Sequence, residues 1–442
     1  MKTSAALATR PITTEPNVTH YEWAGTTLKR LLKSQQPIAE TWAFFSGPQK
    51  PARIAKGRGV TMEDLVTARP EVLGPAGADP GNHGQKYFFV KFLDPSDFPP
   101  FAYVGFQPEA AARMRTAVAL KAHVAELLWE DRQAVERLAE LVRPRVDSAE
   151  AFAAFKAAYK RWAIEQARAD WRSDASLDVS LYVAASQKTF AAAAMKRQQT
   201  ARQAIVRLVH RIDFEDDQAI LIETPTLHAI AGLSLQLHPR TPDNFYPKDE
   251  LWIYKRVGPP DGSKGWVLVE PQRTFDKTES GGDFFTPFAW TGVGSAGRLG
   301  FRKPITRTYL HRFVSLMDAT AYPKSHYVRK AVKMTTPGGT TTGRAQWYRL
   351  VEETAWPYFL VRELRFEGPG RSVTPLPHHS FIELHATQGE VTASLGDGRR
   401  ARITFTVSPT QPVFLPASLP DSTITYRADR PAQLQFFTRP KK

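Results

Sequence analysis

Short runs of apolar residues, broken by proline and glycine, occur in both halves of the chain and predict β-strands. Near the N-terminus these runs are AETWAFF, KYFFVKFLD and FAYVGF. From Asp217 onward the pattern returns in AILIET, LSLQLH, ELWIYKRV and GWVLVEP. The turn residues Pro260-Asp261-Gly262 separate the last two runs, as expected for neighbouring antiparallel strands. The pattern therefore predicts a mainly β protein.

After Trp356 the chain continues with further strand-like runs that have turn signals at regular intervals. They are YFLVRELRF, HSFIELHAT, EVTASLG, ARITFTV, PVFLPA, STITYRA and AQLQFF. Such a series is typical of a complete sandwich or jelly-roll barrel. We therefore expect the C-terminal part of the chain to form a β-domain.

Between Glu109 and about Asp213 the pattern changes to that of α-helices. Glycine is absent from this stretch, alanine is abundant, and apolar residues recur at helical spacing. Pro144 is expected to end one helix, and the run from Asp147 to Glu150 has the form of a capping box that opens the next. This stretch predicts an all-helical subdomain inserted into a β-protein.

The composition excludes several kinds of chemistry. The chain has no cysteine, which rules out disulfides, thiolate metal sites, iron–sulfur clusters and cysteine nucleophiles. The net charge of +15 favours an anionic partner. The basic residues are dispersed without a dense block, so a phosphorylated small molecule fits the charge and nucleic acid is not expected.

No apolar run approaches the length of about 18 residues that crosses a membrane, so no membrane partner is expected. The N-terminal residues lack the apolar core of a signal peptide. The expected location is the cytoplasm.

Four side chains that can bind a metal ion lie between Leu227 and Trp252: His228, Gln236, His238 and Glu250. Gln236 and His238 are two positions apart, so both point to the same face of a β-strand. Two nitrogen and two oxygen donors on one hairpin suit a borderline divalent ion such as zinc. The alternative is that His238 is a satisfied core histidine and Glu250 a charge on an edge strand.

Several blocks of the chain resemble the type I phosphomannose isomerases, which are metal-dependent enzymes of the cupin superfamily. The blocks are AETWAFFSGPQKPARI, YFFVKFLD, TPTLHAI, LSLQLHP, KDELW, LVEPQRTFDKTES and the terminal run from YFLVRELRF to STITY. The resemblance implies two cupin-like jelly-roll β-barrels plus an all-α subdomain. It also implies that His228, Gln236, His238 and Glu250 bind Zn²⁺ or another divalent metal.

The same resemblance assigns candidate catalytic residues. Lys248 matches the family's active-site lysine, and Glu270 and Asp276 match two conserved acidic positions of the family's motif. Each of these three is a candidate base, and the sequence does not distinguish among them. Lys91 and Arg273 are candidates for neutralising a substrate phosphate. Lys255 and Arg256 are interpreted as ordinary surface charges.

The order of the motifs departs from the family pattern. In the family, a Gln-x-His strand directly follows the Lys-x-Leu-Asp strand. Here FAYVGFQPE occupies that place, with Gly105 and Gln107 where the ligands are expected. LSLQLHP instead follows the helical stretch, and the arginine expected after the Asp-x-Thr motif falls on Ser280. The chain is therefore identified as a diverged or rearranged member.

A second alignment places TPTLHAIAG before the family's glutamate-containing strand. Gln236 would then replace that glutamate, and the metal site would be degenerate. The joint match of LSLQLHP and KDELW in the right mutual order favours the first alignment.

A chain of 442 residues is too long for one ordinary core. The expected division is residues 1–108 for the N-terminal part of the first cupin domain, 109–215 for the helical subdomain, 216–300 for the metal-binding part of the first cupin domain, and 301–442 for the C-terminal cupin domain with its connecting segment. The sequence leaves the oligomeric state open.

The expected function is the interconversion of mannose 6-phosphate and fructose 6-phosphate by a metal-dependent aldose–ketose isomerase. One alternative is a catalytically degenerate cupin that binds a sugar or sugar phosphate without turnover. Another is a different cupin enzyme, such as a metal-dependent oxygenase, which would need iron.

Overall fold

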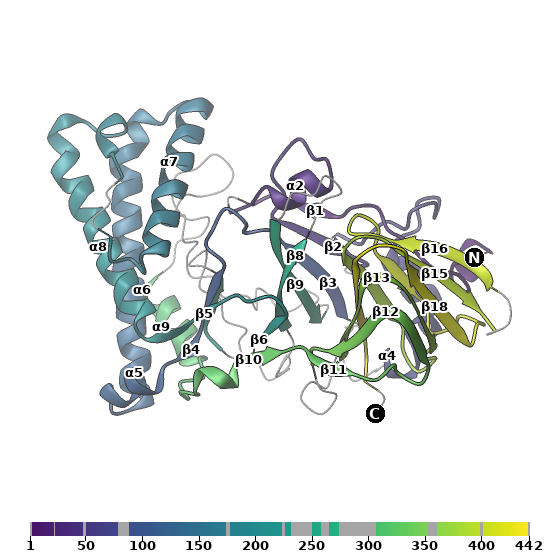
Figure 1. The fold of residues 1–442 in the computed structure, drawn as a ribbon. Helices are drawn as coiled ribbons and strands as arrows, with labels where there is room; N and C mark the ends of the chain where they lie inside the picture. The colour runs from purple at the N-terminus through teal and green to yellow at the C-terminus, as the bar shows by residue number, and fades with distance from the viewer. Residues whose placement is uncertain are drawn as a thin grey trace.

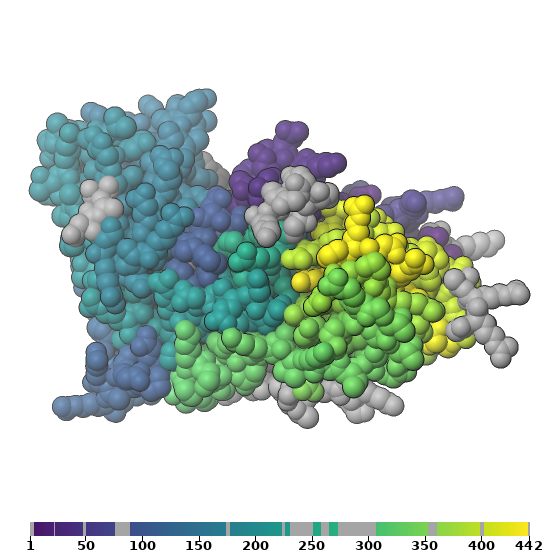
Figure 2. All heavy atoms as spheres, in the orientation of Figure 1, coloured from purple at the N-terminus to yellow at the C-terminus, as the bar shows by residue number. Residues whose placement is uncertain are grey.

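The computed structural model describes the chain at residues 2–21, 23–46, 50–77, 88–173, 177–222, 226–230, 250–257, 265–273, 306–351, 360–397 and 401–440. Across these residues the strands form three sheets, and the long helices gather at one end of the molecule (Figure 1). Figure 2 shows the helices and the C-terminal strands at opposite ends of the surface. The mainly β fold with a helical insertion that the sequence predicts is confirmed.

The central sheet contains seven strands in the described part of the chain. In spatial order they are β1 (Val18–Thr19), β2 (Glu40–Ala43), β3 (Phe88–Leu93), β9 (Gly265–Arg273), β8 (Glu250–Val257), β6 (Gln218–Ile222) and β10 (Val328–Lys330). All neighbouring pairs are antiparallel.

Both faces of the central sheet are buried, and β8 shows why. Leu251 and Ile253 belong to a core shared with the C-terminal strands. Trp252 and Tyr254 belong to a second core, which is shared with the helices. Because successive side chains of a strand point to opposite faces, the run ELWIYKRV supplies apolar residues to both cores.

A small sheet covers the Trp252 face of the central sheet. Its order is β5 (Val209–Asp213), β4 (Phe101–Phe106) and β7 (His228–Ile230). In this sheet Val104 pairs with His228. Val104 and Trp252 belong to the same hydrophobic core, which places β7 over β8.

Five helices account for the helical end of the molecule within the described residues: α5 (Pro108–Arg113), α6 (Ala117–Val142), α7 (Ala149–Arg168), α8 (Lys188–Val206) and α9 (Arg307–Ser315). Ser148 caps α7 by accepting a hydrogen bond from the backbone N–H of Ala151. The cap therefore lies one residue later than the predicted capping box at Asp147, because the serine hydroxyl reaches the N–H in the first turn.

Shorter helical turns connect the larger elements. They are α1 (Lys2–Leu7), α2 (Thr27–Leu31), α3 (Met62–Ala68), α4 (Gly74–Gly77), η1 (Pro70–Leu73), η2 (Arg143–Arg145), η3 (Val179–Leu181), η4 (Ala185–Gln187) and η5 (Lys324–His326). A search of the described helices finds none with the length and apolar character needed to cross a membrane.

The C-terminal sheet is formed by the strands that follow residue 331. They are β11 (Val332–Met334), β12 (Thr340–Arg349), β13 (Leu360–Pro375), β14 (Ile382–Gln388), β15 (Val391–Gly396), β16 (Ala401–Val407), β17 (Val413–Leu415), β18 (Thr423–Ala428) and β19 (Ala432–Thr438). The main path runs β16-β15-β18-β13-β19-β14-β17, and β12 pairs with β11 and β13.

The long strand β13 joins the two halves of this sheet. Its first part, from Leu360 to Phe366, pairs with β19, and its second part, from Gly370 to Pro375, pairs with β18. The sheet therefore bends around a hydrophobic core of its own, built from β12 to β19.

Candidate functional site

A buried ion pair lies on the face of the central sheet that the small sheet covers. Lys91 of β3 and Glu270 of β9 stand directly opposite each other in the strand register. The Lys91 Nζ lies 2.6 Å from the Glu270 Oε1, and the two side chains are 11% and 2% exposed. Removing two charges from water is costly unless they are paired, so each group keeps the other ionised.

A second polar position adjoins this pair. Gln272 is two residues after Glu270, so both side chains point to the same face, and Gln272 is also buried. The register sets Gln272 opposite Phe89 on one side and residue 250 on the other. The backbone thus brings strands β3, β9 and β8 together at the predicted third metal ligand, Glu250.

His228 approaches the same face from the small sheet. Its ring packs edge-on against Trp252 with centroids 4.6 Å apart, and it is 1% exposed. Trp252 is two residues after Glu250, on the same face of β8. The predicted fourth ligand therefore lies over the part of β8 that neighbours Glu270 and Gln272.

The hydrogen bonding of His228 suits a metal ligand. The Nδ1 lies 3.1 Å from the backbone oxygen of Thr226, and because that oxygen only accepts, the proton is assigned to Nδ1. This tautomer leaves the lone pair on Nε2, which is the arrangement that metal-binding histidines use. An imidazole nitrogen together with amide and carboxylate oxygens is a donor set that suits zinc.

The remaining predicted ligands cannot be placed beside His228. Gln236 and His238 lie in 231–249, outside the described residues, and Glu250 is described for its backbone alone. Within the described part of the chain, no three His, Cys, Asp or Glu side chains come close enough to hold a metal ion. The four-residue metal site stays a prediction.

Some of the predicted catalytic residues have described side chains, and others lie outside the described residues. Lys91 and Glu270 meet, as described above. Lys248 and Asp276 lie outside the described residues. The backbone of Arg273 is paired with that of Phe88 at the end of β9, one position after Gln272.

The two positions where the resemblance expects ligands are Gly105 of β4 and Gln107, which follows the end of that strand. The Gln107 Nε2 donates a hydrogen bond to the Val209 backbone oxygen at 2.6 Å. Gly105 has a φ of +56°, and a Cβ there would lie 2.0 Å from the Tyr327 Oη. Only glycine accepts both this backbone angle and this close approach.

A second buried polar network was missed by the sequence interpretation. Lys255, interpreted as a surface charge, is 2% exposed. Its Nζ lies 2.6 Å from the Glu363 Oε2 and 2.7 Å from the Asp217 Oδ1. It lies on the face of β8 that bears Ile253, so it points between the central and C-terminal sheets. The signal in the sequence is that Lys255 comes two residues after Ile253 in ELWIYKRV, so the two side chains share a face of the strand. Arg256 is exposed, as expected for a surface charge.

Comparison with known proteins supports the fold. No protein-family model matches the chain, and no curated protein matches it. Solved structures do match, among them three variants of phosphomannose isomerase from Salmonella typhimurium. One has a TM-score of 0.51 at 14% identity and covers 98% of this chain and 100% of the other. The second has a TM-score of 0.51 at 13% identity with the same coverage. The third has a TM-score of 0.50 at 14% identity and covers 97% of this chain and 99% of the other.

These likenesses define the class of fold. The chain has a phosphomannose-isomerase fold along almost its whole length. At this identity the likeness concerns the fold alone, so the activity has to be argued from the residues.

Proposed function

We propose that this protein is a metal-dependent isomerase of sugar phosphates that interconverts mannose 6-phosphate and fructose 6-phosphate. The observation that carries the proposal is the buried Lys91–Glu270 pair on the face that His228 also approaches. The shared fold supports it, as do the sequence blocks that resemble the isomerase family.

The reaction requires a proton to move between adjacent carbons. A base removes the proton from C2 of the aldose while O1 gains a proton, which gives an enediol. The proton then returns to C1 as O2 loses its proton, which gives the ketose. Glu270 is the candidate base that lies in the described site, and Lys91 holds its carboxylate in the ionised form that accepts a proton. Lys248 and Asp276 remain the other candidates.

The metal ligands of this proposal are His228, Gln236, His238 and Glu250. When bound there, a divalent ion such as zinc would polarise the carbonyl or hydroxyl oxygens of the sugar. His228 would contribute its Nε2 because Nδ1 bonds to Thr226. Lys91, which is engaged by Glu270, and Arg273 remain the candidates to neutralise the phosphate.

The test is a coupled assay for fructose 6-phosphate formed from mannose 6-phosphate, with metal analysis of the same preparation. We expect about one equivalent of a divalent metal per chain, loss of turnover after chelation, and recovery when zinc is added back. Bound metal without turnover would overturn the isomerase proposal. Binding of mannose 6-phosphate under those conditions would support a cupin that binds sugar phosphate without converting it.

A further inference from the structure

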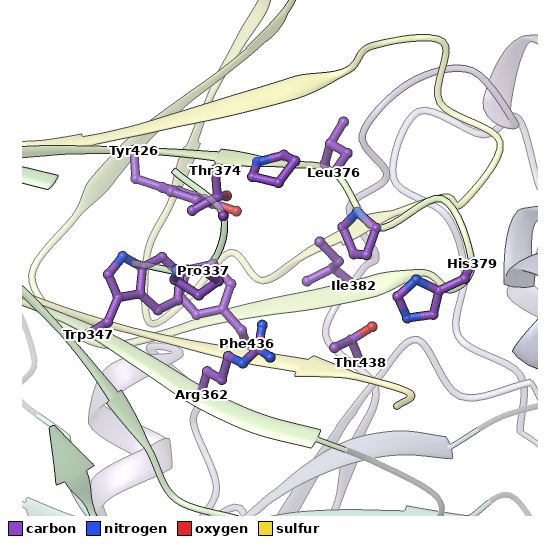
Figure 3. Close-up of a pocket in the computed structure, with 13 residues that line it drawn as sticks. Pro337, Trp347, Arg362, Thr374, Leu376, His379, Ile382, Tyr426, Phe436 and Thr438 are labelled. Carbon is purple, nitrogen blue, oxygen red and sulfur yellow. The ribbon is translucent and has the colours of Figure 1, made fainter. Parts of the chain in front are cut away.

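A pocket opens inside the C-terminal sheet, away from the site described above. It has a volume of about 380 Å³ and is lined by residues of β12, β13, β14, β18 and β19 (Figure 3). Gly338 and Pro375 at its rim are exposed, so the pocket is open to solvent. Small-molecule sites typically have volumes of about 300–1,000 Å³, so this pocket is large enough for a ring-sized ligand.

The alternation of β13 explains why the pocket is polar at one end. Leu364 and Phe366 point into the core of the C-terminal sheet. Arg362 has the same parity on this strand, so its side chain also points inward. It stands opposite Phe436 in the register, and Figure 3 shows its guanidinium beside that ring. A cation thus occupies a position where the strand pattern otherwise places apolar residues.

Three aromatic side chains form the wall of the pocket. The rings of Trp347 and Phe436 have centroids 4.6 Å apart, and Tyr426 packs edge-on against Phe436 at 5.1 Å. The Trp347 Nε1 donates a hydrogen bond to the Ser372 Oγ at 2.9 Å, which fixes the indole. These side chains are at most 5% exposed. The wall is therefore rigid and apolar, as suits contact with the ring of a ligand.

The polar groups of the pocket favour an anion. Arg362 is a permanent cation, and His379 lies on the opposite side, with its Nε2 3.3 Å from the Arg439 backbone oxygen. Thr374 and Thr438 also line the pocket, and the Thr438 hydroxyl donates a hydrogen bond to the Phe381 backbone oxygen at 2.8 Å. Among the described lining residues there is no aspartate or glutamate.

We propose that this pocket is a second ligand site, which binds a small ring-bearing anion. The carboxylate or phosphate would pair with Arg362, and the ring would lie against Trp347 and Phe436. Both an aromatic carboxylate and a sugar phosphate have this chemistry. The pocket lies on the inner face of β13, whereas Val361 on the other face packs toward the central sheet. The proposal therefore does not rest on the isomerase activity.

The test is a binding titration of the unaltered protein with benzoate and mannose 6-phosphate, followed by calorimetry and ligand-observed NMR. Benzyl alcohol and mannose are the uncharged counterparts. We expect at least one anion to bind and its counterpart to bind at least about tenfold more weakly, because an ionised partner strengthens the hydrogen bonds. Benzoate binding that Arg362→Met weakens would identify an aromatic acid. Mannose 6-phosphate is also the proposed substrate of the other site, so it counts as a ligand of this pocket only where Arg362→Met weakens its binding.

Variants separate this pocket from the candidate active site. Arg362→Met is expected to weaken anion binding about tenfold or more. A ligand ring that lies on Trp347 is expected to change the tryptophan fluorescence of the unaltered protein on binding, and Trp347→Phe is expected to remove that change. Arg427→Met is the matched control, because Arg427 follows Tyr426 on β18 but its side chain is exposed and pairs with Asp429. Circular dichroism reports whether each variant folds. If Arg362→Met fails to fold, Arg362→Lys keeps the charge and is expected to weaken binding through loss of the bidentate geometry.

Two results would overturn the proposal. One is that neither anion binds the unaltered protein at millimolar concentration. The other is binding that neither the Arg362 nor the Trp347 variant changes, which would place the anion elsewhere, for example at the candidate active site. The isomerase assay is run separately, so its failure leaves this conclusion intact.

Discussion

Among the described residues, two buried lysine–glutamate pairs have the same separation but different surroundings. In both Lys91–Glu270 and Lys255–Glu363 the Nζ–Oε distance is 2.6 Å. The first pair joins neighbouring strands of one sheet and lies on the face that His228 approaches. The second pair joins two sheets, and further charges surround it.

Contacts across the sheet interface characterise the second pair. Glu363 also accepts hydrogen bonds from Arg365 at 2.5 Å and from Gln435 at 3.3 Å, and Lys255 also contacts Asp217. The Lys255–Glu363 pair joins β8 of the central sheet to β13 of the C-terminal sheet, so we assign it to holding the sheets together. Lys91–Glu270 lies within one sheet on the face that His228 approaches, and it is the pair to which we assign the proposed chemistry.

The largest expected effect comes from Glu270→Gln. Under the isomerase proposal this change removes the candidate base, and general bases contribute about 10²- to 10⁴-fold to the rate. We expect kcat to fall by about 10³-fold in steady-state assays corrected for the folded fraction. Glu363→Gln is the matched control, since it also removes a carboxylate from a buried lysine. If Glu270→Gln retains its kcat, the base is another residue, and Lys248 and Asp276 are the next variants to test.

The strands that form this site could be predicted from the sequence because both of their faces are buried. Apolar residues therefore occupy most positions of ELWIYKRV and GWVLVEP, and of the run that contains Lys91. Strand β12 was not predicted, because TTTGRAQWYR has few apolar residues and only Trp347 is buried. The side-chain pairing of Lys91 with Glu270 depends on register between distant segments. The apolar pattern helps to set register where only one face of a strand is buried, but both faces of these strands are buried, so the pattern does not show which distant residues stand opposite each other.

The sequence pattern also does not show which charged residues are buried beside a partner from a distant part of the chain. Lys255 was interpreted as a surface residue because lysine is rarely buried without a partner. Its partner Glu363 lies in the other sheet, more than a hundred positions further along the chain. The pocket at Arg362 was missed for a similar reason, since β12, β13 and β19 bring its wall together only after they pair.

The second prediction tests the structural role of Lys255–Glu363. Glu363→Gln leaves the charge of Lys255 buried, which costs about 3–5 kcal/mol when one partner of a buried pair is removed. Because Asp217 still contacts Lys255, we expect the lower end, about 3 kcal/mol, in urea unfolding. Asp217→Asn should cost about 1 kcal/mol, since this aspartate is partly exposed.

A double variant tests the structural role assigned to Lys255–Glu363 further. Lys255→Met with Glu363→Gln removes both charges, so it should recover part of the stability that Glu363→Gln loses. Isomerase kcat, normalised to folded protein, should stay unchanged in each variant. A loss of kcat comparable to that of Glu270→Gln would contradict the division between the two pairs.

The third prediction concerns a buried acid in the same interface that has a histidine as its neighbour. The Glu383 Oε2 lies 3.1 Å from the His385 Nε2, and both side chains are fully buried. Burial raises the pKa of Glu383 well above its ordinary value, and it lowers the pKa of His385 to about 3. Burial therefore favours the neutral form of both groups, in contrast to the two lysine–glutamate pairs.

The two shifts act on stability in opposite directions. Below about pH 6.5 the unfolded chain protonates His385 and the folded chain does not, so the stability from this residue falls with decreasing pH. Glu383 is protonated in the folded chain at pH values where the unfolded chain has lost that proton. The stability from Glu383 is therefore fully present below about pH 4.3 and is lost as the pH rises.

The measurement is the free energy of unfolding at pH 8 and pH 5 for the unaltered chain, His385→Gln and Glu383→Gln. The unaltered chain should have a larger free energy of unfolding than His385→Gln at pH 8, and this difference should shrink by about 2 kcal/mol between pH 8 and pH 5. The difference in free energy of unfolding between the unaltered chain and Glu383→Gln should grow over the same interval. The Asp217→Asn variant is the control for the loss of a charge at the same interface without a change at Glu383 or His385. A His385→Gln difference that instead grows between pH 8 and pH 5 would mean that His385 is protonated and paired with an ionised Glu383, and the contrast with Lys91–Glu270 and Lys255–Glu363 would then be lost. Differences that do not change with pH would mean that folding shifts the pKa of neither residue, which would contradict the effect of burial.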